Sequence, residues 1–404
     1  MKPQKNKRNW PGNLLRALFS RAALIILLIL TAFSAFGQMA QGKAKWLGNI
    51  WYNSSEPLKF SEYWNQATAE NGGKWESVEA QRDRMNWSTI DAMYKWCKNK
   101  GFPYTQHVLV WGSAGLGWLN NLPASEQKEE VEEWIRLYGE RYPDTDYIVV
   151  VNEMFHAPPF YKNAIGGNGE TGWDWVVWAF EKARQYCPQS QLLINEYNVI
   201  EGWTPVLEYV KLINLLKSRK LIDGVGIQNH GLENINVDAI ISRTNELATA
   251  GVPLFVTELD IAMRSETEQK DKYAELFPIF YEHPAVAGIT LWGYLEGHHW
   301  RNNAHIMNVD GTERPALTWI REYMASQPDV VPTPVPVCVL KGDGNGDNQV
   351  NIVDALLAAR FYVDPGVDIP LPLCLDVDCS SAVNIIDALL IARKYVGFFA
   401  DFDC

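Results

Sequence analysis

Short apolar runs alternate with longer amphipathic stretches from Lys45 to Ala325. This alternation predicts repeated βα units and a parallel sheet, because each strand is buried on both faces and a helix returns the chain across the sheet. Eight of the runs have the length of a strand, and eight parallel strands close a (β/α)₈ barrel. We expect these strands at residues 45–52, 63–69, 104–111, 147–153, 191–198, 224–230, 254–261 and 288–294.

The stretches between these runs have helical periodicity. Residues 125–142 predict a helix with Ser125 as its N-cap and glutamates in its first turn, where they favour the positive end of the helix dipole. Residues 173–186 predict a second helix, in which Trp175 and Trp178 recur at helical spacing. We interpret these rings as packing against the barrel, with a sugar contact as the alternative.

Prolines at positions 328, 332, 334 and 336 mark a change after the last predicted helix. Proline at this density forms an extended, semi-rigid spacer. We therefore place a linker at residues 327–337, between a barrel domain at residues 43–326 and a small module at residues 338–404.

The N-terminus has the order of a secretory signal peptide. Basic residues come first, an apolar run follows at residues 22–33, and small residues come last. We expect cleavage near Gly37, so that residues 1–37 are removed and the mature protein is secreted without a membrane segment. An uncleaved membrane anchor is the alternative, but the run is shorter than the roughly 20 residues that a bilayer requires.

The chain is acidic, with a formal net charge of −12. Loss of residues 1–37 removes six basic residues and no acidic ones, which changes the charge to −18. Such a surface repels phosphate backbones, so we expect no nucleic acid partner. A polysaccharide partner is compatible with this charge.

Four of the six cysteines lie within the last 67 residues. In an exported chain this clustering indicates disulfides that hold a domain too small to be stabilised by its core alone. Three pairings are open, and we predict Cys338 with Cys374 and Cys379 with Cys404. The other two cysteines fall in helical stretches, and we expect buried free thiols at Cys97 and Cys187.

Two glutamates end predicted strands of the barrel. Glu153 follows the run YIVVVN on the fourth strand, and Glu258 follows LFVT on the seventh. The C-terminal ends of barrel strands form the mouth where active sites lie, so we expect both carboxylates to project into it. A pair of carboxyl groups about 5 to 5.5 Å apart can cleave a glycosidic bond with retention, one as acid/base and the other as nucleophile.

Polar residues beside these glutamates fit supporting roles. Asn152 precedes Glu153, and its amide is expected to hold a sugar 2-hydroxyl or the nucleophile. Asp260 lies two residues past Glu258 and so points to the same side of the strand. His230 ends the sixth predicted strand, where it would orient Glu258 while Asp260 fixes its tautomer. A core histidine without this role is the alternative.

Seven segments between residues 45 and 325 resemble glycoside hydrolase family 10 xylanases and occur in that family's order. They are TAENGGKWE at residues 68–76, HVLVW at 107–111, VNE at 151–153, NEYN at 195–198, GIQNH at 226–230, TELDI at 257–261 and WGY at 292–294. The resemblance implies an endo-β-1,4-xylanase with Glu153 as acid/base and Glu258 as nucleophile, and no cofactor for catalysis. It also implies that xylan or a xylo-oligosaccharide is bound by Asn71, Lys74, His107, Trp111, Tyr197, Gln228, Trp292 and Trp300.

The sequence departs from the family pattern at three places. Gly112 stands where most members have a histidine, Glu196 replaces an aspartate, and the loop at residues 297–301 differs. These departures affect the expected tolerance of substrate side chains more than the chemistry. A related retaining β-1,4-glucanase or mixed-linkage enzyme, and a sugar-binding barrel without catalysis, are the alternatives. A metal site at His298, His299 and His305 is disfavoured, because adjacent histidines rarely converge on one ion.

A duplicated segment follows the linker, with an offset of 33 residues. In its first copy, oxygen-bearing residues stand at positions 1, 3, 5, 7 and 12 of an EF-hand-type calcium loop, namely Asp343, Asn345, Asp347, Gln349 and Asp354. The second copy offers Asp376, Asp378, Ser380 and Asp387, and we expect weaker binding there. Position 6 is Asn348 rather than the usual glycine. The loop tolerates this replacement because asparagine accepts a left-handed backbone. We therefore predict an all-α module with structural Ca²⁺.

Each loop leads into a predicted helix, at residues 355–362 and 388–396. The whole module resembles type I dockerins, which implies a cohesin-type protein partner. Recognition in that family commonly uses polar residues at loop positions 10 and 11, but here these are Ile352, Val353, Ile385 and Ile386. A calcium-stiffened terminal domain without a cohesin partner is the alternative.

Overall fold

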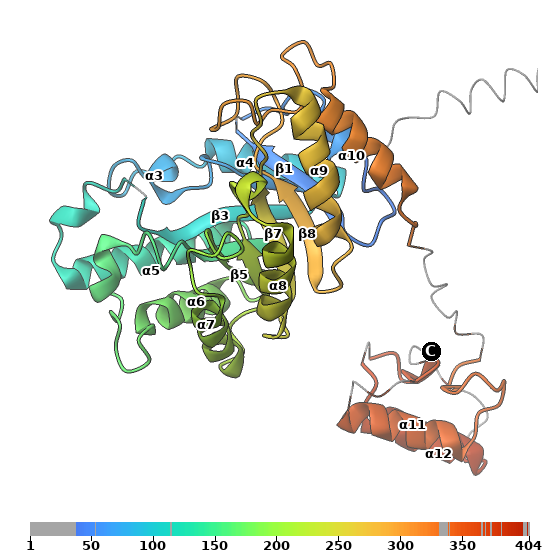
Figure 1. The fold of residues 1–404 in the computed structure, drawn as a ribbon. Coiled ribbons are helices and arrows are strands. Elements are labelled where there is room, and N and C mark those ends of the chain that lie inside the picture. The colour runs from blue at the N-terminus through green and yellow to red at the C-terminus, as the bar shows by residue number, and fades with distance from the viewer. Residues whose placement is uncertain are drawn as a thin grey trace, which may run out of the picture. The chain divides into compact units, whose positions relative to one another are not determined.

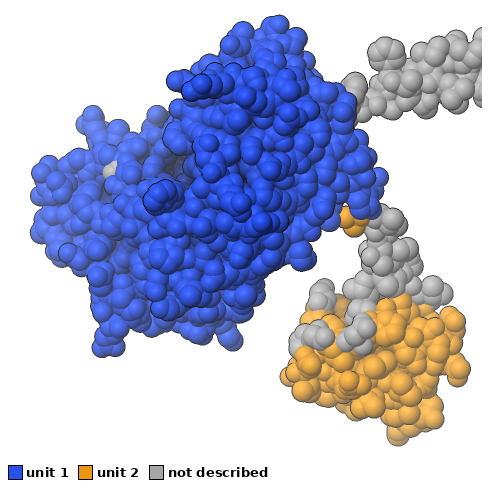
Figure 2. All heavy atoms as spheres, in the orientation of Figure 1, with its two compact units in different colours: residues 1–329 blue, residues 330–404 orange. Residues whose placement is uncertain are grey.

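The computed structural model describes residues 38–52, 54–113, 115–330, 338, 340–364, 367, 369–371, 374–380, 382–398 and 402. The chain divides into two compact units, residues 1–329 and residues 330–404, which have different colours in Figure 2. The predicted signal peptide and residues 331–337 of the predicted linker lie outside the described residues. Within the described ranges, none of the helices is both long enough and apolar enough to cross a membrane.

In the described part of the first unit, eight parallel strands close into a barrel, as predicted (Figure 1). Each strand pairs with the next along the chain, and β8 pairs with β1 to complete the ring. The strands are β1 (Trp46–Trp51), β2 (Ala67–Ala69), β3 (Tyr104–Trp111), β4 (Tyr147–Asn152), β5 (Gln191–Glu196), β6 (Gly224–Ile227), β7 (Leu254–Leu259) and β8 (Val286–Leu291).

Amphipathic helices join the strands and bury one face. In α5 (Ala124–Arg141), the buried residues Val131, Trp134, Ile135 and Tyr138 recur at helical spacing. The Trp134 indole donates to the Leu109 carbonyl of β3 at 3.0 Å. The helices in the described part of this unit are α2 (Phe60–Tyr63), α3 (Trp75–Val78), α4 (Ser88–Lys100), α5 (Ala124–Arg141), α6 (Asp174–Tyr186), α7 (Val206–Ser218), α8 (Val237–Ala248), α9 (Glu266–Tyr281) and α10 (Pro315–Ser326).

Several predicted boundaries were wrong. The predicted second strand is mostly not a strand, because Tyr63 ends α2 and only residues 67–69 pair with their neighbours. Helix α5 begins at Ala124 after Pro123, so Ser125 lies inside the helix and is not its N-cap. Strand β4 ends one residue before Glu153, whose backbone is left-handed with a φ of 56°.

The barrel interior is closed at one end by aromatic rings. Trp46 stacks on Phe255 with ring centroids 5.2 Å apart, and a Cβ at Gly288 would lie only 2.1 Å from the Trp46 ring. Gln66 is fully buried, and its amide nitrogen donates to the hydroxyls of Thr68 and Thr105, both at 2.9 Å. These contacts fill the interior with protein, so the open end of the barrel is left for a site.

Helices α11 (Ile352–Val363) and α12 (Ile385–Tyr395) pack against each other in the second unit. Each begins three residues earlier than predicted, because Asn351 and Asn384 act as N-caps in capping boxes with Asp354 and Asp387. The predicted disulfide between Cys338 and Cys374 is present. The predicted partner of Cys379, Cys404, lies outside the described residues.

Candidate active site

A cleft of about 650 Å³ opens at the C-terminal ends of the strands, where the predicted glutamates were expected. All but one of the barrel residues predicted for the site line this cleft: Asn71, Lys74, His107, Trp111, Asn152, Glu153, Tyr197, Gln228, His230, Glu258, Trp292 and Trp300. The exception is Asp260, which is fully buried. The cleft is also lined by Glu70, Asn198, Gly231 and Arg301, which the sequence analysis did not single out.

Glu153 lies directly after β4, where its left-handed backbone ends the strand. The Trp111 indole donates to its Oε2 at 2.8 Å, and the Gln228 amide donates to its Oε1 at 3.1 Å. Burial raises the pKa of Glu153 above its ordinary value, and the negative charge of Glu258 adds to this, whereas the two hydrogen bonds act in the opposite direction. The arrangement favours a carboxyl group that can carry a proton to a substrate.

Glu258 lies on β7 and accepts hydrogen bonds on both carboxylate oxygens. Asn195 Nδ2 donates to Oε1 at 2.7 Å, and His230 Nε2 lies 3.2 Å from Oε2. The other ring nitrogen of His230 lies 2.9 Å from Asp260 Oδ2. Burial lowers the pKa of His230, but the two acids outweigh this effect and raise it to about 10. A protonated His230 therefore donates one ring N–H to each of these acids.

A chain of amides joins the two glutamates. Asn152 Oδ1 accepts from Asn195 Nδ2 at 2.8 Å and from Gln228 Nε2 at 3.3 Å, and these two amides also donate to Glu258 and Glu153 respectively. Of the two roles expected for Asn152, contact with the nucleophile is wrong, because Asn195 makes that contact. Thr257 donates its hydroxyl to Asn195 Oδ1 at 2.7 Å, which fixes the orientation of the amide.

The other wall of the cleft is cationic and aromatic. Lys74 Nζ donates to Asn71 Oδ1 at 2.7 Å and lies 4.6 Å from the centroid of the Trp111 ring. Burial, and next the charge of Lys74, lower the pKa of His107 to about 3, so this histidine is neutral above that pH. Its ring meets Trp292 edge to face at 5.3 Å. The polar groups of such a wall can bind sugar hydroxyls, and its aromatic rings can stack on the face of a sugar.

Two of the departures from the family pattern have a local structural reason. A Cβ at Gly112 would lie 2.2 Å from the carbonyl oxygen of Ala157, so the backbone after β4 fills the space that a side chain would occupy. Glu196 is fully buried and accepts the backbone N–H groups of Phe155 and Tyr197, both at 2.9 Å. It therefore ties together the loops that follow β4 and β5.

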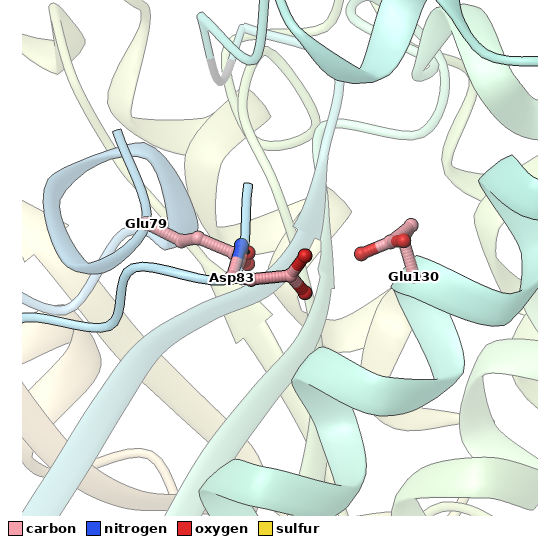
Figure 3. Close-up of side chains that lie close together, drawn as sticks. All are labelled: Glu79, Asp83 and Glu130. Atoms are coloured by element: carbon pink, nitrogen blue, oxygen red, sulfur yellow. Dashed lines mark hydrogen bonds between the residues drawn. The ribbon is translucent and has the colours of Figure 1, made fainter. Parts of the chain in front are cut away.

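Two acidic groups in the described residues are compact enough to share a cation. One is Glu79, Asp83 and Glu130, and the other is Asp376, Asp378 and Asp387. In the first, shown in Figure 3, Glu79 accepts from the backbone N–H of Asp83 at 2.7 Å, and Glu130 pairs with Arg82. Neither group contains a histidine.

A profile of glycosyl hydrolase family 10 matches residues 29–323. Endo-1,4-beta-xylanase B of Cellvibrio japonicus is 39% identical over 280 residues, which are 68% of this chain and 45% of that protein. An anti-sigma-I factor of Acetivibrio thermocellus is 26% identical over 266 residues, 65% of this chain and 34% of that protein. The chain thus spans less than half the length of these curated relatives.

Solved structures share the barrel. The family 10 protein of Paenibacillus barcinonensis has a TM-score of 0.66 at 21% identity, over 72% of this chain and 98% of that chain. Xylanase 10B of Thermotoga petrophila RKU-1, solved with xylobiose, has a TM-score of 0.63 at 22% identity, over 72% of this chain and 97% of that chain. These likenesses agree on the fold, and since the family profile matches most of the sequence, the chain belongs to glycosyl hydrolase family 10.

Proposed function

We propose that the barrel is a retaining endo-β-1,4-xylanase that hydrolyses internal bonds of xylan. The observation that carries this proposal is the pair of glutamates in one cleft with different surroundings. Glu258 accepts hydrogen bonds from Asn195 and His230, which suits a charged nucleophile. Glu153 has a raised pKa, which suits an acid that is protonated before the reaction.

In the first half of the reaction, a Glu258 oxygen attacks the anomeric carbon and Glu153 gives its proton to the departing glycosidic oxygen. The sugar is then bonded covalently to Glu258. In the second half, Glu153, now ionised, removes a proton from water, and that water displaces Glu258 from the sugar. Two inversions at the same carbon leave its configuration unchanged. The side chains described above supply every proton donor and acceptor that these steps require.

Xylan is favoured over glucan by the aromatic wall. Xylose lacks the hydroxymethyl group of glucose, which would need additional room near Trp292 and Trp300. Trp292 is only 8% exposed and is packed by His107, which restricts its movement away from a larger sugar. The name of the Cellvibrio japonicus relative supports the same substrate.

The test compares reducing sugar released from linear xylan, carboxymethylcellulose and mixed-linkage β-glucan, and follows the first product by proton NMR. The proposal expects rapid hydrolysis of xylan, little of the other two, and a product that appears as the β-anomer. Preference for a glucan would support the related β-glucanase instead. A product that first appears as the α-anomer would contradict retention, and no hydrolysis at all would support a sugar-binding barrel.

We also propose that the second unit binds calcium through its duplicated loops. The carboxylate oxygens of Asp376, Asp378 and Asp387 lie within 4.8 Å of one another, and oxygen atoms are the ligands that Ca²⁺ prefers. In the first loop, Asp343 would play the part of Asp376, and Asn348 has the left-handed φ of 61° that position 6 requires. Each loop carries three carboxylates, so the number of charges does not support the weaker second site expected above.

The sequence also carries proposals for the partner and the location of the protein. We propose a cohesin-type partner, because the duplicated loop-and-helix pattern is that of a docking module, and secretion, because of the order of residues 1–37. The disulfide between Cys338 and Cys374 suits an oxidising compartment. Retention of the purified protein on an immobilised cohesin in calcium, and its release by chelator, would test the partner.

A further inference from the structure

Asp260 is a fully buried carboxylate with three donors around it. Its Oδ2 lies 2.9 Å from His230 Nδ1 and accepts from the Trp300 indole at 2.7 Å, and its Oδ1 accepts from the Arg301 guanidinium. A buried charge needs such partners, because its desolvation is otherwise costly. Two of the three donors come from the loop after β8, which is one of the places where the sequence departs from the family pattern.

Arg301 joins two further parts of the barrel mouth. Besides Asp260 at the end of β7, it pairs with Glu233 in the turn Leu232–Asn234 after β6. The side chain of Glu233 is only 5% exposed, so both acids that face Arg301 are held away from water. A guanidinium can form paired hydrogen bonds with fixed geometry, which an ammonium group cannot. Arg301 therefore fixes the β8 loop against the β6 and β7 ends.

Trp300 belongs to both the cleft and the buried chain. The residue is 58% exposed and lines the cleft, while its indole N–H reaches the buried Asp260. The same ring meets His230 edge to face, with centroids 4.8 Å apart. A sugar that stacks on this ring would therefore press on a residue that donates to Asp260 and touches the ring of His230, the histidine behind Glu258.

We propose that Trp300 and Arg301 are positioning residues, which clamp the Asp260–His230 pair so that sugar binding against Trp300 holds Glu258 in its attacking orientation. This inference deepens the proposed function and rests on it. Its consequence is that the Trp300 N–H and the Arg301 guanidinium act on kcat through Asp260. A role limited to sugar contact would instead act on KM.

The test is a double-mutant cycle between Trp300→Phe, which keeps a ring and removes the N–H, and Asp260→Asn. Trp300→Phe alone is expected to lower kcat about tenfold, the usual weight of one hydrogen bond to a buried charge, with KM changed less than about threefold. In the Asp260→Asn background the same substitution should have almost no further effect. Arg301→Lys should behave in the same way. The control substitutions are Trp203→Phe, at a residue that is 78% exposed on the loop after β5, and Arg219→Lys, whose side chain is 44% exposed.

Two kinetic outcomes would overturn the clamp: losses in kcat that multiply in the double variant, or a loss confined to KM. If Asp260→Asn does not fold, the cycle is run with His230→Gln. The kinetics use the dinitrophenyl glycosides of both xylobiose and cellobiose, so a wrong sugar assignment appears as turnover of the cellobioside only. A substrate-free readout is the low-field imidazole proton of His230 in NMR spectra. It should broaden in Trp300→Phe and stay sharp in Trp203→Phe, and an unchanged signal in Trp300→Phe would also contradict the clamp.

Discussion

Glu153 and Glu258 line the same cleft, yet the groups around them prepare them for opposite tasks. Glu258 receives N–H groups on both oxygens, one of them from His230. Glu153 is held by two neutral donors, and its burial disfavours the charged form. At the scale of single residues, this difference predicts different consequences for removing each carboxylate.

Glu258→Ala should lower kcat on xylan by more than about 10⁴-fold, because the covalent intermediate can no longer form. Glu153→Ala should lose about 10² to 10⁴-fold on xylan but much less on a dinitrophenyl glycoside, whose leaving group needs no proton. Azide should accelerate this second variant and yield a β-glycosyl azide. Glu170→Ala, at an exposed position, is the control. Equal losses on both substrates for Glu153→Ala would contradict its role as acid.

The pH dependence of kcat/KM reports the same acid. In the proposed mechanism Glu153 must be protonated, so activity should be lost as the pH rises through its pKa. The Trp111 N–H favours the ionised form of Glu153 and lowers that pKa, so Trp111→Phe should raise the pKa and move the alkaline limb to higher pH. Trp203→Phe should leave the limb in place. A limb that moves to lower pH in Trp111→Phe would mean that another group controls it.

Glu153 and Glu258 could be located from the sequence because each ends an apolar run that predicts a strand, whereas Asn71, Tyr197 and Gln228 were predicted only from the resemblance to family 10. Asn195 is different. It was part of a recognised segment, but its contact with Glu258 depends on the register that places it level with Asn152 on β4. Arg301 lies in an irregular loop, and no periodicity in the sequence points from that loop to Asp260.

Among the elements, the pairing of β5 with β6 has the most direct effect on the site. Asn195 on β5 is level with Gly226 on β6, and a Cβ at that glycine would lie 2.3 Å from Asn195 Oδ1. The glycine therefore leaves space for the amide that donates to Glu258. The pairing of β5 with β6 therefore determines whether Asn195 can donate to Glu258.

Gly226→Ala should displace the Asn195 side chain and lower both stability and kcat. Overpacking of this kind costs about 1 to 3 kcal/mol of the free energy of unfolding, which urea denaturation measures. Gly117→Ala is a matched control, since a Cβ there has no neighbour within 4 Å. Unchanged kcat in a folded Gly226→Ala protein would show that Asn195 does not need its present position.

The hydrophobic periodicity of the sequence was enough to predict that the strands and helices exist. Their first and last residues depend on local backbone geometry, which this periodicity does not describe. The predicted fourth strand was one residue too long because Glu153 has a left-handed backbone. Helix α11 was predicted too short, because the capping box of Asn351 and Asp354 recruits Ile352 and Val353 into its first turn. Asp354 had been predicted only as a calcium ligand, and Asn351 had not been singled out.

For the whole molecule, the division into two compact units predicts separable responses to calcium removal. Chelation should lower the melting temperature of the second unit alone, since an ion at one hundred times its Kd stabilises a fold by about 2.7 kcal/mol. Xylan hydrolysis by the full chain should be unchanged. Calorimetry with and without EDTA, repeated on Asp343→Asn combined with Asp376→Asn, provides the measurement. Identical thermograms and equal protease resistance in both conditions would contradict the calcium proposal.

The cysteines give the two units different redox chemistry. Cys97 and Cys187 are buried in the barrel, where desolvation raises the pKa of each thiol to about 12, so neither forms the thiolate that disulfide exchange requires. The second unit instead contains the bridge between Cys338 and Cys374. Expression in a reducing cytosol should therefore be compatible with folding of the barrel. The second unit needs an oxidising environment to form its disulfide.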